Sequence, residues 1–251
     1  LFRSVVDVVS KINTGAKYDS KAFQKSVGLN GVGTKAVNAL SNYFKVTAFR
    51  DGKEKTAEFE RGVLTQDHKE TKTTEENGTL VTFVPDDKIF KNFHFVQEYL
   101  DNQFWNYCYL NAGLVMNLNN KRYVSKNGLL DLLQRKTNED EIRYPIIHLK
   151  GEDIEVALTH ENDYGEEYYS FVNGQFTTQG GTHLAAFREA LIKTIREFYK
   201  KDYDATDIRG SVCAALSVRV QEPVFESQTK TKLGSQTVYE GGPSMRNFIG
   251  D

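Results

Sequence analysis

The chain has 251 residues, of which 39% are hydrophobic and 26% are charged, and its formal net charge is −2. This composition excludes an intrinsically disordered chain, because such chains combine few apolar residues with a high net charge. The nearly balanced charge also argues against binding of nucleic acid through bulk charge, since domains of that kind are strongly basic. The length allows two domains or one large one.

Charge is nevertheless unevenly distributed along the chain. Residues 1–50 contain eight lysines and arginines and two aspartates, whereas residues 151–170 contain seven acidic residues and no lysine or arginine. A basic segment around a glycine-rich loop suits an anionic ligand, and a solvated surface is the alternative interpretation of the same charges.

The cysteines and the hydropathy indicate a cytoplasmic protein with no membrane partner. Cys108 and Cys213 each lie in an apolar run, and no Cys/His cluster has metal-ligand spacing, so we expect buried free thiols and no metal-binding residue. No apolar run reaches the roughly 18 residues of a membrane span. The opening residues, LFRSVVDVVSKI, are too short and too mixed for a signal peptide.

The first half of the chain predicts helices and a hairpin. Residues 1–13 show apolar residues at helical spacing, and residues 13–33 predict a loop long enough to be a functional lid or disordered. Residues 34–44 predict a helix with Ala36, Val37, Leu40 and Phe44 on one face, and a strand, an Asp51-Gly52 turn and a second strand follow. Further on, we expect a strand at 79–84, a helix over 95–113, two short strands over 114–125 and a helix at 128–136.

The second half predicts strands at 146–149, 154–158 and 168–172, then a helix with Phe187, Leu191, Thr194, Ile195 and Phe198 on one face. The apolar run 212–220 predicts a central strand, and the segment 226–242 is polar and flexible in composition. The polar residues 137–141 are the expected domain boundary. These elements together predict an α+β fold with two layers in each half.

The sharpest chemical feature is Gly28-Leu29-Asn30-Gly31-Val32-Gly33, which runs directly into a predicted helix. Glycines let backbone amides approach a ligand closely, and a helix start offers free N–H groups and a positive dipole end, so the segment suits phosphate. A plain tight turn is the alternative. The segment matches neither the P-loop, which needs Gly-Lys-Ser/Thr, nor the dinucleotide motif, which needs a preceding strand.

A resemblance to a known family adds to this interpretation. Residues 16–41, AKYDSKAFQKSVGLNGVGTKAVNALS, resemble the ATP lid of gyrase and topoisomerase IV B subunits. Three further segments match the family in order: Gly78-Thr79 leading into LVTF, GGTHLAAFREAL at 180–191, and FESQTKTKLGS at 225–235. On these four matches, the chain is identified as a member of the B subunits of bacterial type IIA DNA topoisomerases.

This resemblance implies an α+β fold in which a partial GHKL ATPase α/β sandwich at residues 1–137 is followed by a transducer domain, with a ribosomal-protein-like β/α fold, at residues 138–251. It implies an ATP-dependent enzyme subunit that couples ATP binding and hydrolysis to DNA strand passage. The implied cofactors are ATP and Mg²⁺, and the implied partners are DNA, the topoisomerase A subunit and a second copy of the B subunit.

The resemblance also implies roles for individual residues. Backbone amides of Gly28, Leu29, Asn30, Gly31, Val32 and Gly33 would wrap the triphosphate, Phe23 and Gln24 would lie along the nucleotide, and Thr79 would help hold adenine. Lys230, with Gln228 beside it, would reach the γ-phosphate from the second domain. A lysine suits this role because its compact charge on a long stem pairs with a terminal phosphate and loses that partner when the phosphate leaves. His183 and Trp105 are expected to be structural.

The sequence also departs from the family pattern. Val27 and Asn30 stand where most members have Gly and His, which is more typical of topoisomerase IV-type B subunits. In the family, the general-base glutamate, the Mg²⁺-binding asparagine and the adenine-reading Asp-x-Gly precede the lid, so we expect residues 1–251 alone not to hydrolyse ATP. A mismatch-repair-type GHKL ATPase and a non-catalytic truncated homologue remain as alternatives.

Overall fold

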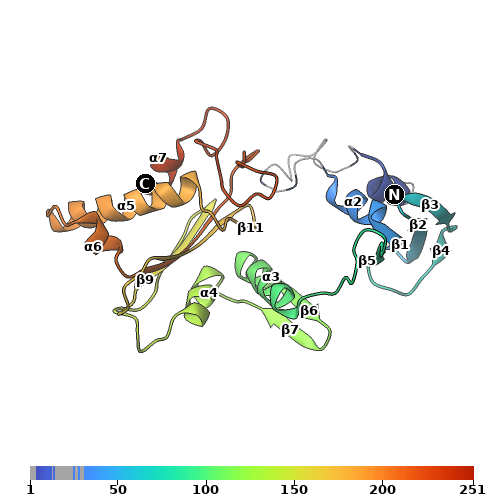
Figure 1. Ribbon diagram of the computed structural model, residues 1–251, viewed down its shortest axis with the longest axis horizontal. Coiled ribbons are helices and arrows are strands. Elements are labelled where there is room, and N and C mark those ends of the chain that lie inside the picture. Colours follow the sequence, from blue (N-terminus) through green and yellow to red (C-terminus); the bar gives the residue numbers. More distant parts are fainter. Residues whose placement is uncertain (1–3, 13, 15–24, 26–27, 29–30) are drawn as a thin grey trace. The chain divides into compact units, whose positions relative to one another are not determined.

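The computed structural model describes residues 4–12, 14, 25, 28 and 31–251, and the chain forms two compact units (Figure 1). The first unit comprises Leu1–Phe23 and Gly28–Phe95, and the second comprises Gln24–Val27 and Val96–Asp251. Among the described residues, no helix has the length and apolar character needed to cross a membrane.

The first unit contains an antiparallel sheet and two short helices. Its elements are α1 (Ser4–Ser10), α2 (Gly33–Ala39), β1 (Ser41–Arg50), β2 (Lys53–Glu60), β3 (Val63–Asp67), β4 (Thr71–Lys72) and β5 (Gly78–Pro85). The strand order is β3-β2-β1-β5, and β4 pairs with β2. Val5 and Val9 of α1 pack on one face of this sheet together with Phe44, Val46 and Phe59.

The helix predicted over residues 34–44 ends at Ala39, and its extension to Phe44 is wrong. The following residues form β1, which lies between β2 and β5. As a strand residue Phe44 is opposite both Phe59 and Phe83, and it is fully buried. Aromatic and β-branched residues along 43–49 favour this extended state over a helix.

The predicted apolar face of the same helix is not its buried face. Val37 and Leu40 are exposed, whereas Asn38 is 1% exposed. The Asn38 Nδ2 donates a hydrogen bond to the Val9 carbonyl oxygen of α1 (3.0 Å). A polar contact therefore connects α2 to α1. The helical spacing of apolar residues does not predict such a contact.

Two-residue turns join β1 to β2 and β2 to β3. In the turn between β1 and β2, Asp51 has a φ of 54° and Gly52 a φ of 74°. Positive φ at both central residues is the type I′ geometry, whose twist matches that of the flanking strands. The predicted Asp51-Gly52 hairpin is therefore confirmed.

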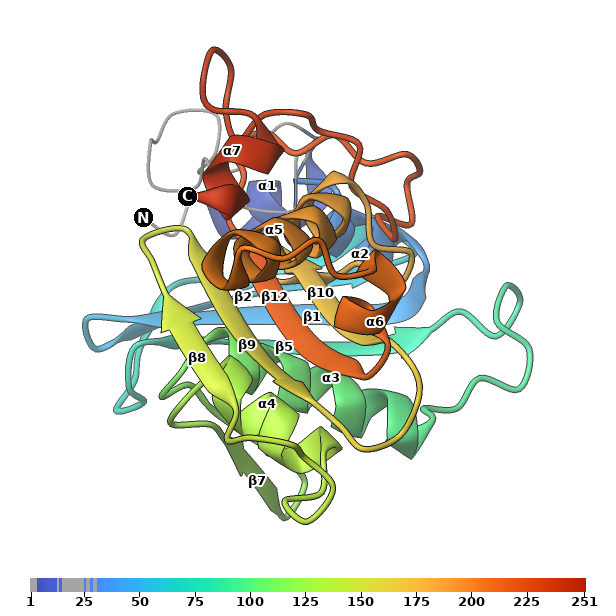
Figure 2. The same ribbon diagram turned by 90° about the vertical axis from the view of Figure 1, so that its left-hand side faces the viewer.

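The second unit is a five-stranded mixed sheet covered by helices. Its elements are α3 (Gln97–Leu110), β6 (Val115–Leu118), β7 (Lys121–Val124), α4 (Leu129–Lys136), β8 (Ile147–Lys150), β9 (Ile154–His160), β10 (Glu167–Val172), β11 (Gln175–Phe176), α5 (Thr182–Tyr199), α6 (Ala205–Arg209), β12 (Val212–Val218) and α7 (Met245–Gly250). The strand order is β11-β10-β12-β9-β8, and Figure 2 shows β10, β12, β9 and β8 side by side. The apolar run at 212–220 is the central strand, as predicted.

Side chains of β12 alternate between two cores. Leu216 and Val218 contact a core that includes Phe187 of α5, whereas Cys213 contacts a core that includes Leu132 of α4. Helices α5 and α4 accordingly lie on opposite sides of the sheet (Figure 1). Both cysteines are buried and free, as the sequence predicts.

The compact units divide between Phe95 and Val96, upstream of the polar residues 137–141. Helix α4, which ends just before those residues, packs into the core of the second unit. The assignment of residues 1–137 and 138–251 to two family domains remains a prediction.

Candidate functional site

The glycine loop leads into α2 in the first unit. Gly28, Gly31, Val32 and Gly33 are described, whereas Phe23, Gln24, Leu29 and Asn30 lie outside the described residues. Gly31 has a φ of 57°, a conformation that glycine adopts far more readily than other residues. Gly33 begins α2, and a Cβ at this position would meet no atom within 4 Å. The described residues therefore leave space beside the Gly33 Cα.

Lys35 stabilises the end of this loop. Its Nζ donates hydrogen bonds to the carbonyl oxygen of Gly31 (2.5 Å) and to that of Thr14 (3.1 Å). One ammonium group thus holds residues 14 and 31 close together. No sequence motif predicts these contacts of Lys35. The one sequence feature that relates to them is the position of Lys35 in the first helical turn after the loop.

A pocket of about 570 Å³ lies in the same unit, between α1, the start of α2, β1 and β5. Thr79, the residue predicted to help hold adenine, lines this pocket together with Val81 of the same strand. Thr34, which directly follows Gly33, also lines it. The structure therefore brings Thr79 and Thr34, the residue that follows the glycine loop, to one pocket, and its lining includes none of the described loop residues Gly28, Gly31, Val32 and Gly33.

The pocket combines apolar walls with a few polar groups. Val5, Val8 and Val9 of α1 form one wall, and Arg50 and Asn77 contribute polar groups. Sites for small planar ligands have this composition. Among the described residues of the lining there is no aspartate or glutamate, so this lining offers no carboxylate to a Mg²⁺ ion. The helical spacing of the α1 valines was the signal for this wall, although it predicts only a packing face.

Gln228 and Lys230 lie in the second unit, in the segment between β12 and α7. Lys230 has a φ of 57°, and its backbone N–H donates to the Ser227 carbonyl oxygen (3.0 Å), which closes a tight turn. The Gln228 side chain is exposed, and Lys230 is half-buried. The turn therefore presents the two predicted residues at the surface of the second unit.

Backbone hydrogen bonds attach this turn to the start of α5. Gln179 N donates to Thr231 O (2.9 Å), Leu233 N donates to Gly180 O (3.0 Å), and Thr182 N donates to Leu233 O (3.1 Å). Leu233 is 1% exposed. The segment 226–242 is polar in composition, but the residues after Lys230 are held against the sheet and α5, so the expectation of flexibility is wrong for this part.

His183 lies in the first turn of α5 and is fully buried. Its Nε2 contacts the Thr177 hydroxyl at 3.1 Å, and burial lowers the pKa of its imidazole to about 4. The ring is therefore neutral at physiological pH. A buried neutral imidazole bonded to a threonine is a structural feature, in line with the expectation from the sequence.

Comparison with known proteins decides the family. The family model described as DNA gyrase B matches residues 114–248. The chain belongs to the B subunits of type IIA DNA topoisomerases. Within this topoisomerase family, the B subunit of DNA topoisomerase 4 from Borreliella burgdorferi is 48% identical over 92% of this chain and 38% of its own length. The B subunit of DNA gyrase from Cytophaga aurantiaca is 35% identical over 88% of this chain and 52% of its own length.

Solved structures of topoisomerases share the fold. The 43K ATPase domain of Thermus thermophilus gyrase B, in complex with an aminocoumarin, matches with a TM-score of 0.69 and 28% identity, covering 88% of this chain and 64% of that one. The ATPase region of Saccharomyces cerevisiae topoisomerase II matches with a TM-score of 0.75 at 22% identity, covering 94% and 64%. The chain is thus part of the ATPase region of a topoisomerase B subunit, and it spans roughly half or less of the lengths of the two B subunits named above.

Proposed function

We propose that the pocket lined by Thr79 holds the adenine of ATP and that Gly28–Gly33 enclose the triphosphate. The observation that carries this proposal is the presence of Thr79 and Thr34 in the lining of one pocket. Thr34 follows the glycine loop directly, so a nucleotide with its base against Thr79 would extend its phosphates towards that loop. A structural relative described as a gyrase B ATPase domain supports the same assignment.

Different residues of the pocket and the loop would contact different parts of the nucleotide. Val5, Val8 and Val9 would contact the faces of the purine ring, since apolar walls suit a planar ligand, and the Thr79 hydroxyl would bond to the ring edge. Amides of the loop residues Gly28, Leu29, Asn30, Gly31, Val32 and Gly33 would bond to phosphate oxygens, with Phe23 and Gln24 along the nucleotide. Mg²⁺ and the general base would be held by family positions outside these 251 residues, so these residues alone would bind nucleotide weakly and not hydrolyse it.

Lys230 and Gln228 are proposed to contact the γ-phosphate from the second unit. Their turn is fixed to α5 by backbone hydrogen bonds, which supports a role for a positioned ammonium group. A ligand shifts a conformational equilibrium only if its affinity differs between the two states. A lysine that contacts the γ-phosphate only before hydrolysis would supply that difference.

In the whole protein we propose that this region couples ATP turnover to DNA strand passage, together with an A subunit and a second copy of the B subunit. The higher identity to a topoisomerase 4 relative, 48% against 35% for a gyrase relative, favours a topoisomerase IV-type enzyme. The full-length protein combined with its A subunit should therefore decatenate DNA and fail to introduce negative supercoils. Supercoiling activity in that assay would contradict the assignment.

The pocket proposal is tested by Thr79→Val in the full-length protein. Valine keeps the shape of the side chain and removes the hydroxyl, so calorimetry with a non-hydrolysable ATP analogue should show affinity about 3- to 10-fold lower, as expected for one lost hydrogen bond. The matched control is Thr82→Val, because Thr82 lies on the same strand and is absent from the pocket lining. Equal affinities in the two variants would contradict the proposal.

The match to the DNA gyrase B family model excludes the alternative that the chain is a mismatch-repair-type GHKL ATPase. The non-catalytic homologue makes a different prediction from an ATPase. A full-length protein that neither binds the analogue nor hydrolyses ATP would support the non-catalytic alternative and would contradict the proposed function.

A further inference from the structure

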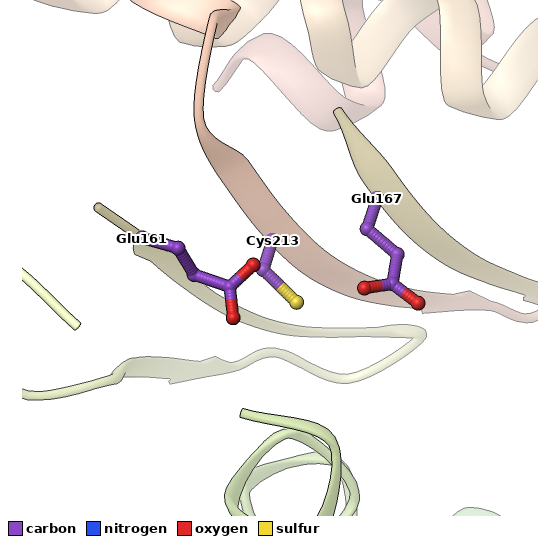
Figure 3. Close-up of side chains that lie close together, drawn as sticks. All are labelled: Glu161, Glu167 and Cys213. Atoms are coloured by element: carbon purple, nitrogen blue, oxygen red, sulfur yellow. The ribbon is translucent and has the colours of Figure 1, made fainter. Parts of the chain in front are cut away.

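Three side chains able to bind a metal converge in the second unit (Figure 3). They are Glu161, Glu167 and Cys213, and one ligand atom from each lies within 4.8 Å of the others. Glu161 directly follows β9, Glu167 begins β10, and Cys213 lies in β12 between those two strands. The cluster therefore joins Cys213 to two glutamates that lie much earlier in the sequence.

The sheet fixes the positions of these residues. Glu167 and Cys213 are paired in the parallel register of β10 and β12. Glu161 N donates to the Ser211 carbonyl oxygen (2.8 Å), which holds the end of β9 beside β12. Because paired strands already hold the backbone of these residues in place, little further ordering of the backbone is needed when a ligand binds.

The charges of the cluster are not balanced by its described neighbours. Within the described residues, the Glu161 carboxylate makes no hydrogen bond or ion pair. Burial and the nearby charges of Glu167, Asp163 and Glu141 raise the pKa of Glu161. Two carboxylates in close proximity disfavour each other's ionised form, and a cation between them removes this cost.

A tyrosine and a lysine lie near the cluster. The Tyr169 hydroxyl donates to the Glu167 carboxylate. The Lys136 ammonium lies over the Tyr169 ring, 5.2 Å from its centroid. Among the described residues, Lys136 is the one cation whose charge lowers the pKa of Cys213. Lys136 forms no ion pair with Glu161 or Glu167 in the described part of the chain. The tyrosine could orient Glu167 from behind, as an outer partner of a metal ligand does.

The thiol supplies a second, independent indication. Cys213 is 0% exposed, and its Sγ has no hydrogen-bond partner among the described residues. The sulfur points into the gap between the two carboxylates (Figure 3). Burial, followed by the charges of Glu161 and Glu167, raises the pKa of this thiol to about 12. A metal ion that coordinates a thiol deprotonates it.

We propose that Glu161, Glu167 and Cys213 bind a divalent metal ion of the zinc class. Carboxylates alone would suit Mg²⁺ or Ca²⁺, but a thiolate ligand selects Zn²⁺, and three protein ligands leave one position for water. On binding, the Cys213 thiol loses its proton to solvent and Sγ bonds to the metal. Tetrahedral ligands of Zn²⁺ lie about 3.3–3.8 Å apart, so the more exposed glutamates would close by roughly 1 Å.

The test is metal binding by the 251-residue chain. Titration with Zn²⁺ against a chelating indicator should give one ion per chain with micromolar or tighter affinity, and Mg²⁺ should not compete. Cys213→Ala should weaken Zn²⁺ binding at least 10-fold, whereas Cys108→Ala, which removes the other buried thiol, should leave it unchanged. Glu161→Gln tests the same site at a half-buried position where the fold is not at risk.

Co²⁺ as a probe identifies the sulfur ligand directly. The chain with Co²⁺ should show a thiolate-to-cobalt charge-transfer band that disappears in Cys213→Ala and persists in Cys108→Ala. Absence of this band in the unmodified chain, or Zn²⁺ affinity that neither Cys213→Ala nor Glu161→Gln changes, would overturn the proposal.

Discussion

Gly181 and Leu233 lie so close together that no side chain fits between them. A Cβ on Gly181 would be 2.3 Å from the Leu233 carbonyl oxygen and 2.5 Å from its nitrogen. The φ of Gly181 is 132°, which side-chain-bearing residues also rarely adopt. This close approach permits the two backbone hydrogen bonds of Leu233 to Gly180 and Thr182. The segment with Lys230 is thus attached to α5 through a glycine.

Gly181→Ala should therefore destabilise the second unit and displace the turn. We expect a loss of at least about 2 kcal/mol in the free energy of unfolding, because backbone strain and a collision add. Gly174→Ala is the matched control, since Gly174 has a φ of 85° but a Cβ there would meet nothing within 4 Å. Urea denaturation should show the larger loss for Gly181→Ala, and equal losses would mean that the close approach to Leu233 costs nothing.

Lys230→Ala should impair hydrolysis in the full-length enzyme. If the ammonium stabilises charge on the γ-phosphate, kcat should fall roughly 100-fold, as is typical for loss of one positioned charge-stabilising group. Lys232→Ala is the control, because Lys232 lies two residues away and forms an ion pair with Glu226 (3.0 Å). Steady-state ATPase rates that fall equally in both variants would point to a general effect of the loop charge.

His183 should make stability depend on pH. The pKa of His183 in the folded chain is about 4, below the ordinary value of 6.5, so the unfolded state binds the proton more readily. The shifted pKa of His183 therefore contributes about 3 kcal/mol to the free energy of unfolding. This contribution is fully present above pH 6.5 and is lost as pH falls towards 4.

His183→Gln should remove this part of the pH dependence. Unfolding free energies measured from pH 7 to pH 4 should fall less steeply in His183→Gln than in the unmodified chain, whatever the variant's stability at pH 7. His94→Gln, at an exposed position, should retain the original slope. Parallel slopes for all three proteins would contradict the burial argument.

Phe44→Ala should unfold or severely weaken the first unit. Phe44 is fully buried between two strand partners, and loss of a buried phenylalanine costs about 3–5 kcal/mol. Val63→Ala should cost less than about 0.5 kcal/mol, because Val63 is 68% exposed. Denaturation monitored by circular dichroism would separate the two, and a small effect of Phe44→Ala would contradict the strand assignment.

The sequence predicts best those elements whose burial shows in a local pattern, either a continuous apolar run or apolar residues at helical spacing. The run at 212–220 is apolar on both faces because both faces of β12 are covered, and this pattern is visible without tertiary information. Helix α5 is also predicted by its spacing, but the predicted apolar face extends too far. Phe198 belongs to that face by spacing and is 78% exposed, because the last turns of the helix extend beyond the core.

Features that depend on contacts between distant segments could not be predicted in this way. Phe44 fits a helical face or a strand equally well until its partners Phe59 and Phe83 are known. The attachment of Leu233 to Gly180 joins residues about fifty positions apart, and no local pattern encodes it. The residues themselves indicate a phosphate-binding glycine loop and the resemblance implies the role of Thr79, whereas the helical spacing of the α1 valines predicts a packing face and not a pocket wall.

The hydrogen bonds between Leu233 and the start of α5 attach the segment that follows Lys230 to this helix. Helix α5 has 18 residues, which corresponds to a length of about 27 Å. A tilt of about 5° at the lysine end would sweep the opposite end through about 2 Å. The exposed Phe198 and Tyr199 occupy that opposite end. If Lys230 contacts the γ-phosphate as proposed, a small change at that phosphate would displace these two aromatic side chains measurably, which makes them suitable positions for a fluorescent reporter.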